Sequence, residues 1–248
     1  MVYERIVDKK RLDFIVNAVK AAIPLSGMVL DIGCGNGIIS RHLGSFGFAV
    51  TGVDISDKAI AIAQQHNTLP NVSFKVIPAE ALVANPDRYD AIICSETLEH
   101  LDRPGALLTT AHALLKDNGI LIVTVPNGRG PRELLVTRPM QWLRQKDNWV
   151  WKLMQRIKRS MGYTGTTIQS AADDLLHRQF FTKSALERLA GDHHFRIVDF
   201  RNANFLEQVF PFSLIAKRSL FIQKADCALA DRLPHSFSSG FMCVWRKK

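Results

Sequence analysis

The chain has 248 residues, of which 47% are hydrophobic and 22% charged. This composition suits a globular fold with a substantial core and excludes disordered, collagen-like and coiled-coil proteins. No apolar run approaches the roughly 18 residues that a membrane span needs, and the N-terminus lacks a signal-peptide core, so we expect a cytoplasmic protein. The net charge of +9 suggests contact with something anionic, such as lipid headgroups, phosphate or nucleic acid.

Hydrophobic spacing predicts strands and helices in alternation along the chain. Residues 9–23 read as an opening amphipathic helix, after which an apolar run at 28–32 breaks into a glycine turn and a helix at 38–46. The pattern continues with strands at 49–54, 72–77, 89–94, 120–125, 195–200 and 241–245 and helices at 56–66, 104–115 and 182–190. Such alternation predicts a parallel sheet with helices on both faces, and we expect residues 241–245 to close its edge.

Two stretches do not follow this rhythm. Residues 204–240 read as a long connection with helical pieces, and residues 128–178 interrupt the alternation with a segment of different character. Between residues 128 and 160 nine basic residues stand against two acidic ones, a net +7 that accounts for most of the charge surplus. Within the same segment, apolar residues recur at helical spacing and form a stripe of Val150, Leu153, Met154, Ile157 and Met161. Three tryptophans adjoin this stripe, namely Trp142, Trp149 and Trp151. This composition fits a lid over a site, or an interfacial helix that places the protein peripherally on an anionic membrane at its inner face. Nucleic-acid binding is disfavoured because no RNA module accompanies the basic segment.

The glycine turn points to a nucleotide-like ligand. Gly33, Gly35 and Gly37 lie where a strand passes into a helix, so a ligand can approach the backbone, although a tight turn alone would also use them. A dinucleotide-binding fingerprint would have its third glycine at position 38, but this residue is Ile38, so that fingerprint is absent. Asp31 precedes the first glycine, and its negative charge would repel a pyrophosphate but attract a cationic group. Asp54 ends the next strand, where a carboxylate can bind the hydroxyls of a ribose.

The four cysteines, Cys34, Cys94, Cys227 and Cys243, fall at no metal-ligand spacing. They are also too sparse for a disulfide framework, so we expect reduced thiols.

The segments 29–37, 53–54 and 89–96 resemble the successive motifs of class I S-adenosylmethionine-dependent methyltransferases, and the likeness covers about residues 27–127. It implies a Rossmann-like α/β fold with a seven-stranded, mostly parallel sheet whose last strand is antiparallel, and S-adenosyl-L-methionine as cofactor. In that family the glycine loop and first acid hold the methionine end, and the second acid holds the ribose. The family's third acid is replaced by Pro78, which leaves the adenine to Ala79 or Glu80. The implied cofactor site comprises Asp31, Gly33, Cys34, Gly35, Asp54, Ile55, Ala79, Glu80 and Ser95.

Glu96, Glu99 and His100 follow the fourth predicted strand, and in a helix they would share one face. Two carboxylates and an imidazole suit Mg²⁺ or Mn²⁺. The spacing resembles O-methyltransferases of ubiquinone biosynthesis and small-RNA 2′-O-methyltransferases, in which a divalent ion is held by these residues and a later histidine, here His177. The alternative is a metal-free site with His100 or His177 as general base.

We therefore expect a cofactor-binding core at 1–127, a basic insertion or lid at 128–178, and the rest of the sheet at 179–248. The resemblance implies transfer of a methyl group to a hydroxyl on a small or lipid-linked acceptor. One alternative acceptor is a sugar of a cell-surface glycan or glycolipid. Another alternative is a non-catalytic cofactor-binding partner protein, against which the intact Gly33, Gly35 and Asp54 argue.

Overall fold

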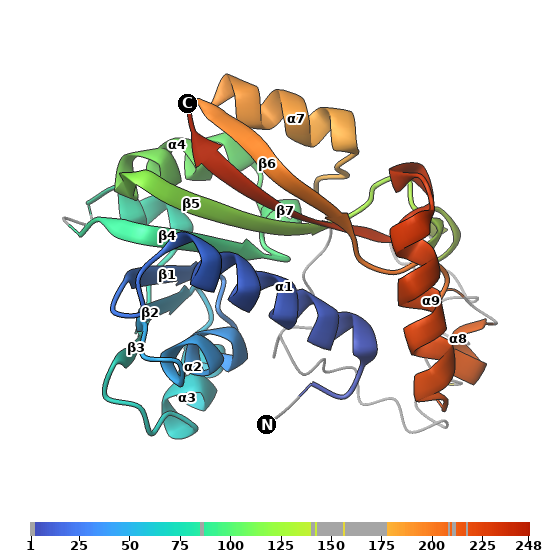
Figure 1. Ribbon diagram of the computed structural model, residues 1–248, viewed down its shortest axis with the longest axis horizontal. Helices are drawn as coiled ribbons and strands as arrows, with labels where there is room; N and C mark the ends of the chain where they lie inside the picture. The colour runs from blue at the N-terminus through green and yellow to red at the C-terminus, as the bar shows by residue number, and fades with distance from the viewer. Residues whose placement is uncertain are drawn as a thin grey trace.

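A seven-stranded sheet forms the centre of the protein, with strands in the order β3-β2-β1-β4-β5-β7-β6 (Figure 1). The structure is a computed structural model that describes residues 3–84, 87–139, 142, 156, 178–207, 209, 212–216 and 218–248. The first five strands run parallel, while β7 is antiparallel to both of its neighbours. The strands are β1 (Met28–Ile32), β2 (Ala49–Asp54), β3 (Val72–Val76), β4 (Tyr89–Ser95), β5 (Leu115–Pro126), β6 (Phe195–Asn202) and β7 (Gly240–Lys247).

Helices cover both faces of this sheet (Figure 1). One face carries α1 (Ile6–Ala22), α2 (Ile38–Gly44) and α3 (Asp57–Gln65), and the other carries α4 (Pro104–Leu114) and α7 (Lys183–Asp192). Each face therefore has its own hydrophobic core. The expected layered architecture, with helices on both sides of a mostly parallel sheet, is confirmed.

The central strands supply both cores because successive side chains point to opposite faces of a strand. In β4, Ala91 and Ile93 pack under α1, α2 and α3, whereas Ile92 and Cys94 pack under α4 and α7. A strand that is buried on both sides is apolar at successive positions, which explains the continuous hydrophobic run in its sequence.

The helix starts follow from side-chain caps. Ser56 accepts a hydrogen bond from the Ala59 amide and Thr182 accepts one from the Ala185 amide, both at 3.2 Å. These bonds satisfy amides that lack a partner within the first helical turn. Both residues sit where the sequence placed the start of a helix, and the helical segments begin one residue later.

One expectation about the sheet is wrong. Residues 241–245 do form a strand, but β7 does not close the edge. It lies between β5 and β6, pairing Val123 with Cys243 on one side and Phe200 with Cys243 on the other. The edge is therefore β6, a strand with half-exposed side chains on both faces, whereas β7 is buried over most of its length.

Gly128, the first residue of the segment 128–178, contacts the chain just beyond the segment. The Gly128 amide donates to the Phe181 carbonyl at 2.7 Å, and the guanidinium of Arg138 donates to the Gly128 carbonyl at 2.8 Å. The predicted stripe and the tryptophans at 149 and 151 lie outside the described residues. Among the residues that are described, no helix is both long and apolar enough to cross a bilayer.

Between β6 and β7 the chain forms α8 (Phe212–Ala216) and α9 (Leu220–Arg232). The α9 helix packs against the first half of α1, where the Ile6 amide donates to Gln223 Oε1 at 3.0 Å. Short helical turns complete the fold at η1 (Ala79–Ala84), η2 (Leu98–His100), η3 (Glu133–Thr137) and η4 (His235–Phe237).

Candidate functional site

The glycine loop between β1 and α2 is fixed by steric limits. Gly33 and Gly37 have φ of +74° and Gly35 has φ of +53°, a region that residues with a side chain seldom adopt. A Cβ on Gly33 would lie 2.4 Å from Thr97 Oγ1, and one on Gly37 would lie 2.4 Å from Phe74 Cζ. The loop thus needs glycine here for conformation and for space.

Backbone hydrogen bonds hold the same loop against the end of β2. The amides of Gly33 and Cys34 both donate to the Val53 carbonyl, at 2.8 and 3.0 Å. Asp54 fixes the next turn, because its carboxylate accepts from the Gly35 and Ser56 amides at 2.9 Å each. The two predicted cofactor segments therefore meet at one edge of the sheet.

Asp31 lies beneath this loop, almost completely buried at the end of β1. Its carboxylate accepts a hydrogen bond from Ser40 Oγ at 2.5 Å. Burial is the main cause that raises the Asp31 pKa to about 6, and the nearby Asp54 charge raises it further, while Ser40 opposes the rise. A cation placed beside this carboxylate would relieve the cost of burying its charge.

Cys34, within the loop, has no features of a nucleophile. Burial and the nearby carboxylates of Asp31 and Asp54 raise the pKa of its thiol far above the ordinary range. The thiol therefore stays protonated. All four cysteines are free, as the sequence predicted.

The adenine side of the predicted site is less fully defined. Ile55 follows Asp54 with its side chain largely exposed at the sheet edge, and Ala79 begins η1. The Ile77 amide donates to the Asp54 carbonyl at 3.1 Å, which brings the start of η1 toward this edge. The side chain of Glu80 lies outside the described part of the chain.

A chain of polar contacts continues along the sheet edge from Ser95. Its hydroxyl lies 3.0 Å from Thr124 Oγ1, which donates to Glu96 Oε1 at 3.0 Å. Glu96 Oε2 lies 3.5 Å from the Arg11 guanidinium. Glu96 also has a φ of +54°, a strained conformation for a residue with a side chain that is frequent at functional sites.

Arg11 brings a positive charge to this edge of the sheet. It comes from α1, is only 7% exposed, and pairs with Asp8 as well as Glu96. Burial lowers the pKa of its guanidinium, but the carboxylates of Glu96 and Asp8 outweigh this effect and raise the pKa. A permanent cation therefore stands beside the predicted metal-ligating glutamates.

Glu99 and His100 lie on the single turn η2, so the predicted helical face with Glu96 does not form. Glu99 is 1% exposed, and its Oε1 lies 3.9 Å from His100 Nε2. Burial, together with the Glu96 charge, raises the Glu99 pKa well above its ordinary value. The Glu99 carbonyl accepts from the amides of Arg178 and Gln179, at 2.8 and 3.0 Å, which brings the chain after the insertion to this turn.

These residues fit a divalent cation only in part. Glu99 Oε2 is buried without a hydrogen-bond partner among the described residues, as a metal ligand could be. Both oxygens of Glu96, however, are engaged by Thr124 and Arg11. Across the described residues no three His, Cys, Asp or Glu side chains gather as a metal site would require, and His177 lies outside them. We therefore derive no chemical step through a metal.

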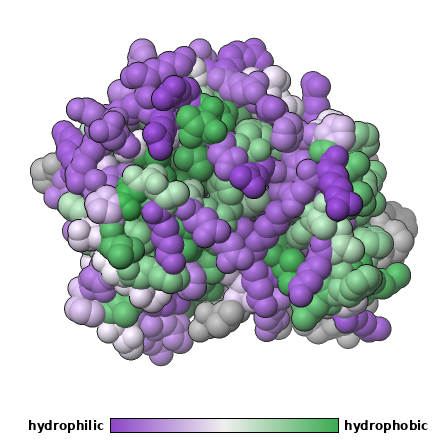
Figure 2. Space-filling model, in the orientation of Figure 1, coloured by the Kyte–Doolittle hydropathy of each residue, from purple (hydrophilic) through white to green (hydrophobic). Residues whose placement is uncertain are grey.

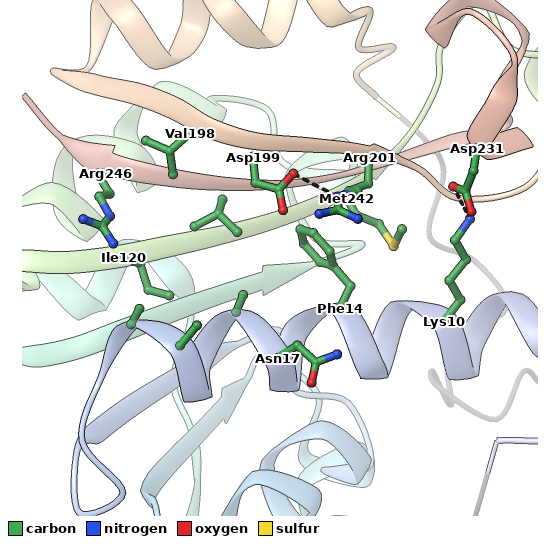
Figure 3. A pocket seen from close by; sticks show the side chains of 14 residues that line it. Lys10, Phe14, Asn17, Ile120, Val198, Asp199, Arg201, Asp231, Met242 and Arg246 are labelled. Carbon is green, nitrogen blue, oxygen red and sulfur yellow. Dashed lines mark hydrogen bonds and ion pairs between the residues drawn. The ribbon is translucent and has the colours of Figure 1, made fainter.

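A groove of about 440 Å³ lies away from this edge, between α1 and strands β5, β6 and β7 (Figure 3). Its lining mixes apolar side chains, such as Phe14 and Met242, with the Arg201–Asp199 ion pair. None of its lining residues belongs to the predicted cofactor set. The groove is therefore not the site that the motifs indicate.

Comparison with known proteins agrees with this architecture. A family model described as a methyltransferase domain matches residues 3–199. The chain belongs to the methyltransferase domain family. The predicted membership and fold class are thereby confirmed.

Among curated proteins, this methyltransferase-family chain is similar to ubiquinone biosynthesis O-methyltransferases. It is 39% identical to the one from Paraburkholderia xenovorans over 102 residues, which is 40% of this chain and 44% of that protein. It is 33% identical to the one from Dechloromonas aromatica over 132 residues, 52% of this chain and 55% of that protein. The chain thus spans about half the length of the curated relatives it matches.

Solved methyltransferase structures share the fold at low identity. The CcbJ methyltransferase from Streptomyces caelestis has a TM-score of 0.60 and 17% identity, covering 96% of this chain and 88% of its own. Magnesium protoporphyrin IX methyltransferase from Synechocystis PCC 6803, with bound SAH, has a TM-score of 0.56 and 18% identity, covering 98% and 84%.

Sequence reasoning missed several residues of this site. Ser40, which bonds Asp31, lies within a predicted helix, and Thr97, which packs on Gly33, follows a predicted strand, but neither carries a motif of its own. Arg11 and Thr124 are distant in sequence from Glu96. The one available signal was that Arg11 lies four residues from Val7 and from Ile15, on the apolar side of the first helix.

Proposed function

We propose that this methyltransferase-family protein transfers a methyl group from S-adenosylmethionine to a hydroxyl. The observation that carries the proposal is the convergence of the glycine loop, Asp31 and Asp54 at one sheet edge, beside the turn that bears His100. The likeness to ubiquinone biosynthesis O-methyltransferases supports oxygen as the accepting atom. The acceptor would be a small or lipid-linked molecule.

The chain's own residues would hold the cofactor by charge and shape. The Asp31 carboxylate would face the ammonium of the methionine end, and the glycine loop would leave room for the sulfonium chain. Asp54 would accept from the ribose hydroxyls, since each carboxylate oxygen has a second lone pair beyond its amide bond. Ile55 and Ala79 would lie along the adenine.

The reaction that this site would support is a single displacement. When bound, the cofactor would supply an electrophilic methyl group to the acceptor oxygen and would leave with the electron pair of its carbon–sulfur bond. We assign the acceptor's proton to His100, the imidazole at this edge that is partly open to solvent. Alignment and removal of this proton are the main tasks left to the protein.

Arg11 and Thr124 would keep Glu96 in place. The guanidinium and hydroxyl neutralise and orient its carboxylate, so that Glu96 can accept a hydrogen bond from the acceptor or the cofactor. A divalent ion held by Glu96, Glu99, His100 and His177 stays a prediction from sequence, as does the use of segment 128–178 as a lid.

The deciding experiment is methylation of a fractionated cell extract with methyl-labelled S-adenosylmethionine. We expect His100→Asn to lower turnover by about 100-fold or more, as loss of a general base does, while binding of S-adenosylhomocysteine stays close to that of the parent protein. The matched control is His66→Asn, which changes an exposed histidine at the end of α3. Full activity of His100→Asn would contradict the assignment.

The same assay with a chelator tests the metal prediction. We expect the labelling to persist, because Arg11 already supplies a cation beside Glu96. If chelator abolishes the labelling and Mg²⁺ or Mn²⁺ restores it, the metal-bound mechanism replaces the general-base mechanism. Label in a glycan fraction would favour the sugar acceptor.

A further inference from the structure

We propose that α8 and the first turn of α9 form a docking surface for an anionic lipid bilayer. This surface, called here the α8–α9 surface, comprises Phe212, Leu214, Ile215, Arg218, Leu220, Phe221 and Lys224. It is independent of the proposed activity, because binding to a bilayer requires neither cofactor nor turnover.

The α8–α9 surface exposes an unusual concentration of large apolar side chains. Phe221 is 80% exposed, Ile215 60% and Leu220 56%. Of the sixteen large hydrophobic side chains that are exposed in the described part of the protein, five lie within residues 212–221. In Figure 2 hydrophobic residues gather on the side of the molecule where Figure 1 shows α8 and α9. Exposed apolar side chains gathered within ten residues are typical of an interaction site.

The α9 helix departs from the pattern of an ordinary surface helix, because it buries polar side chains and exposes large apolar ones. Its buried side carries Gln223 and Asp226, whereas Leu220, Phe221 and Leu229 face outward. The buried polar groups are used internally, because Asp226 accepts from the backbone amides of residues 205 and 206 at 2.9 and 2.8 Å. Polar bonds thus help to anchor the helix, while its largest exposed apolar side chains, Leu220 and Phe221, are available to an external apolar phase.

The positive charge of the α8–α9 segment favours an anionic membrane as the apolar phase that binds there. Residues 208–225 contain three cations, at positions 217, 218 and 224, and no acid. Arg218 and Lys224 are exposed beside the apolar side chains. Long cationic side chains flanking exposed leucine and phenylalanine are typical of interfacial helices.

The α8–α9 surface lies one helix away from the candidate site. The α9 helix contacts α1 through Gln223 and through the Lys10–Asp231 ion pair at 2.7 Å. The α1 helix in turn carries Arg11 to Glu96. A bilayer bound at α8–α9 would therefore lie close to the part of the fold that a lipid-linked acceptor must reach.

The test is co-sedimentation of the full chain with vesicles of phosphatidylcholine, with and without phosphatidylglycerol. We expect binding to the anionic vesicles at low salt and its loss at high salt, because salt screens exposed charges. Leu220→Ser combined with Phe221→Ser should lower the partition coefficient by at least about tenfold. Arg218→Gln and Lys224→Gln should each lower it about fivefold.

Matched controls separate this surface from exposure or charge in general. Leu25→Ser changes a side chain that is 63% exposed at the other end of α1, and Arg188→Gln and Arg196→Gln remove exposed cations from α7 and β6. Leu25→Ser should leave partition unchanged, and each arginine variant should reduce it by less than the Arg218 and Lys224 variants do.

Three results would overturn the proposal. The first is failure of the parent protein to sediment with anionic vesicles at low salt. The second is a Leu220→Ser/Phe221→Ser variant that changes from dimer to monomer in analytical ultracentrifugation, which would make this surface an interface between two copies. The third is a marked fall in the melting temperature of that variant without loss of vesicle binding, which would mean that the chain covers these side chains itself.

Discussion

The two halves of the candidate site are held in place by different means. The glycine-loop half is built from neighbours in sequence, since Asp31, Ser40 and the glycines belong to one strand–turn–helix unit. The acidic half is built from distant segments, since Glu96 contacts Arg11 from the first helix and Thr124 from β5. A local motif therefore predicts the first half well, whereas the charge state of the second half depends on tertiary contacts that a five-residue pattern cannot contain.

The largest expected effect concerns the glycine-loop half of the site. Gly33→Ala should lower the free energy of unfolding by about 4 kcal/mol, because it adds both an unfavourable positive φ and an overlap with Thr97. Denaturant unfolding measures the loss. Gly47→Ala is the matched control, since Gly47 has φ of +95° but its added Cβ would lie 3.8 Å from its nearest neighbour. The control should cost about 1 kcal/mol, and equal losses would refute the steric argument.

A somewhat smaller effect concerns the buried charge of Asp31. Removing this charge should stabilise the fold but weaken cofactor binding. The pKa is about 6 in the folded protein against an ordinary 3.8, so the folded state binds this proton more tightly than the unfolded state. The resulting penalty is absent below pH 3.8, grows as the pH rises, and is complete above pH 6. Asp31→Asn should therefore raise the free energy of unfolding above pH 6 by up to about 3 kcal/mol.

The same variant should bind S-adenosylmethionine at least about tenfold more weakly, because an amide cannot form a charge-assisted hydrogen bond with an ammonium group. Chemical unfolding at several pH values and isothermal titration measure the two effects. Asp117→Asn, at an exposed carboxylate, should change neither. A variant that lost stability above pH 6 would show that the buried charge is already compensated.

The smallest of the three effects concerns the acidic half of the site, which depends on contacts between distant segments. Arg11→Met leaves Glu96 without its cation and should cost about 2 kcal/mol of unfolding free energy, below the full value for a buried pair because Glu96 is partly exposed. Adding Glu96→Gln should restore part of this loss. Arg201→Met breaks an exposed pair with Asp199 and should cost under about 1 kcal/mol. Additive losses in the double variant would mean that Arg11 and Glu96 do not interact.

The sequence predicted much of the fold because strand and helix periods are local properties. All seven strands were expected, and β1 and β2 have the predicted ends. The position of β7 was missed, since its neighbours β5 and β6 are chosen by three-dimensional packing. Helical pieces were expected within 204–240, and α8 and α9 lie there. The exposed side of α9 was not predicted, because this helix buries Gln223 and Asp226 and exposes leucine and phenylalanine, against the usual rule.

For the site, the sequence indicated which segments would meet but not how the acidic side chains would be buried and paired. Asp31, Asp54 and the glycines meet as the motif spacing implies. Glu99 lies in η2 and is almost completely buried, which the spacing of the acidic residues does not indicate. The spacing of Glu96, Glu99 and His100 suggested a shared helical face, but Glu96 precedes a single short turn and has a positive φ.

The place of β7 in the sheet also constrains how the protein can be made. β5 pairs with β7 in a register that joins Ile120 to Arg246, across more than half of the chain. β6 hydrogen-bonds within the sheet through β7 alone among the described strands, so it has no sheet partner until residues 240–247 have been synthesised. During synthesis the first five strands can assemble early, while β6 waits as an unpaired, aggregation-prone strand. Such long-range pairing slows folding, so refolding after dilution from denaturant should be limited by docking of this last strand.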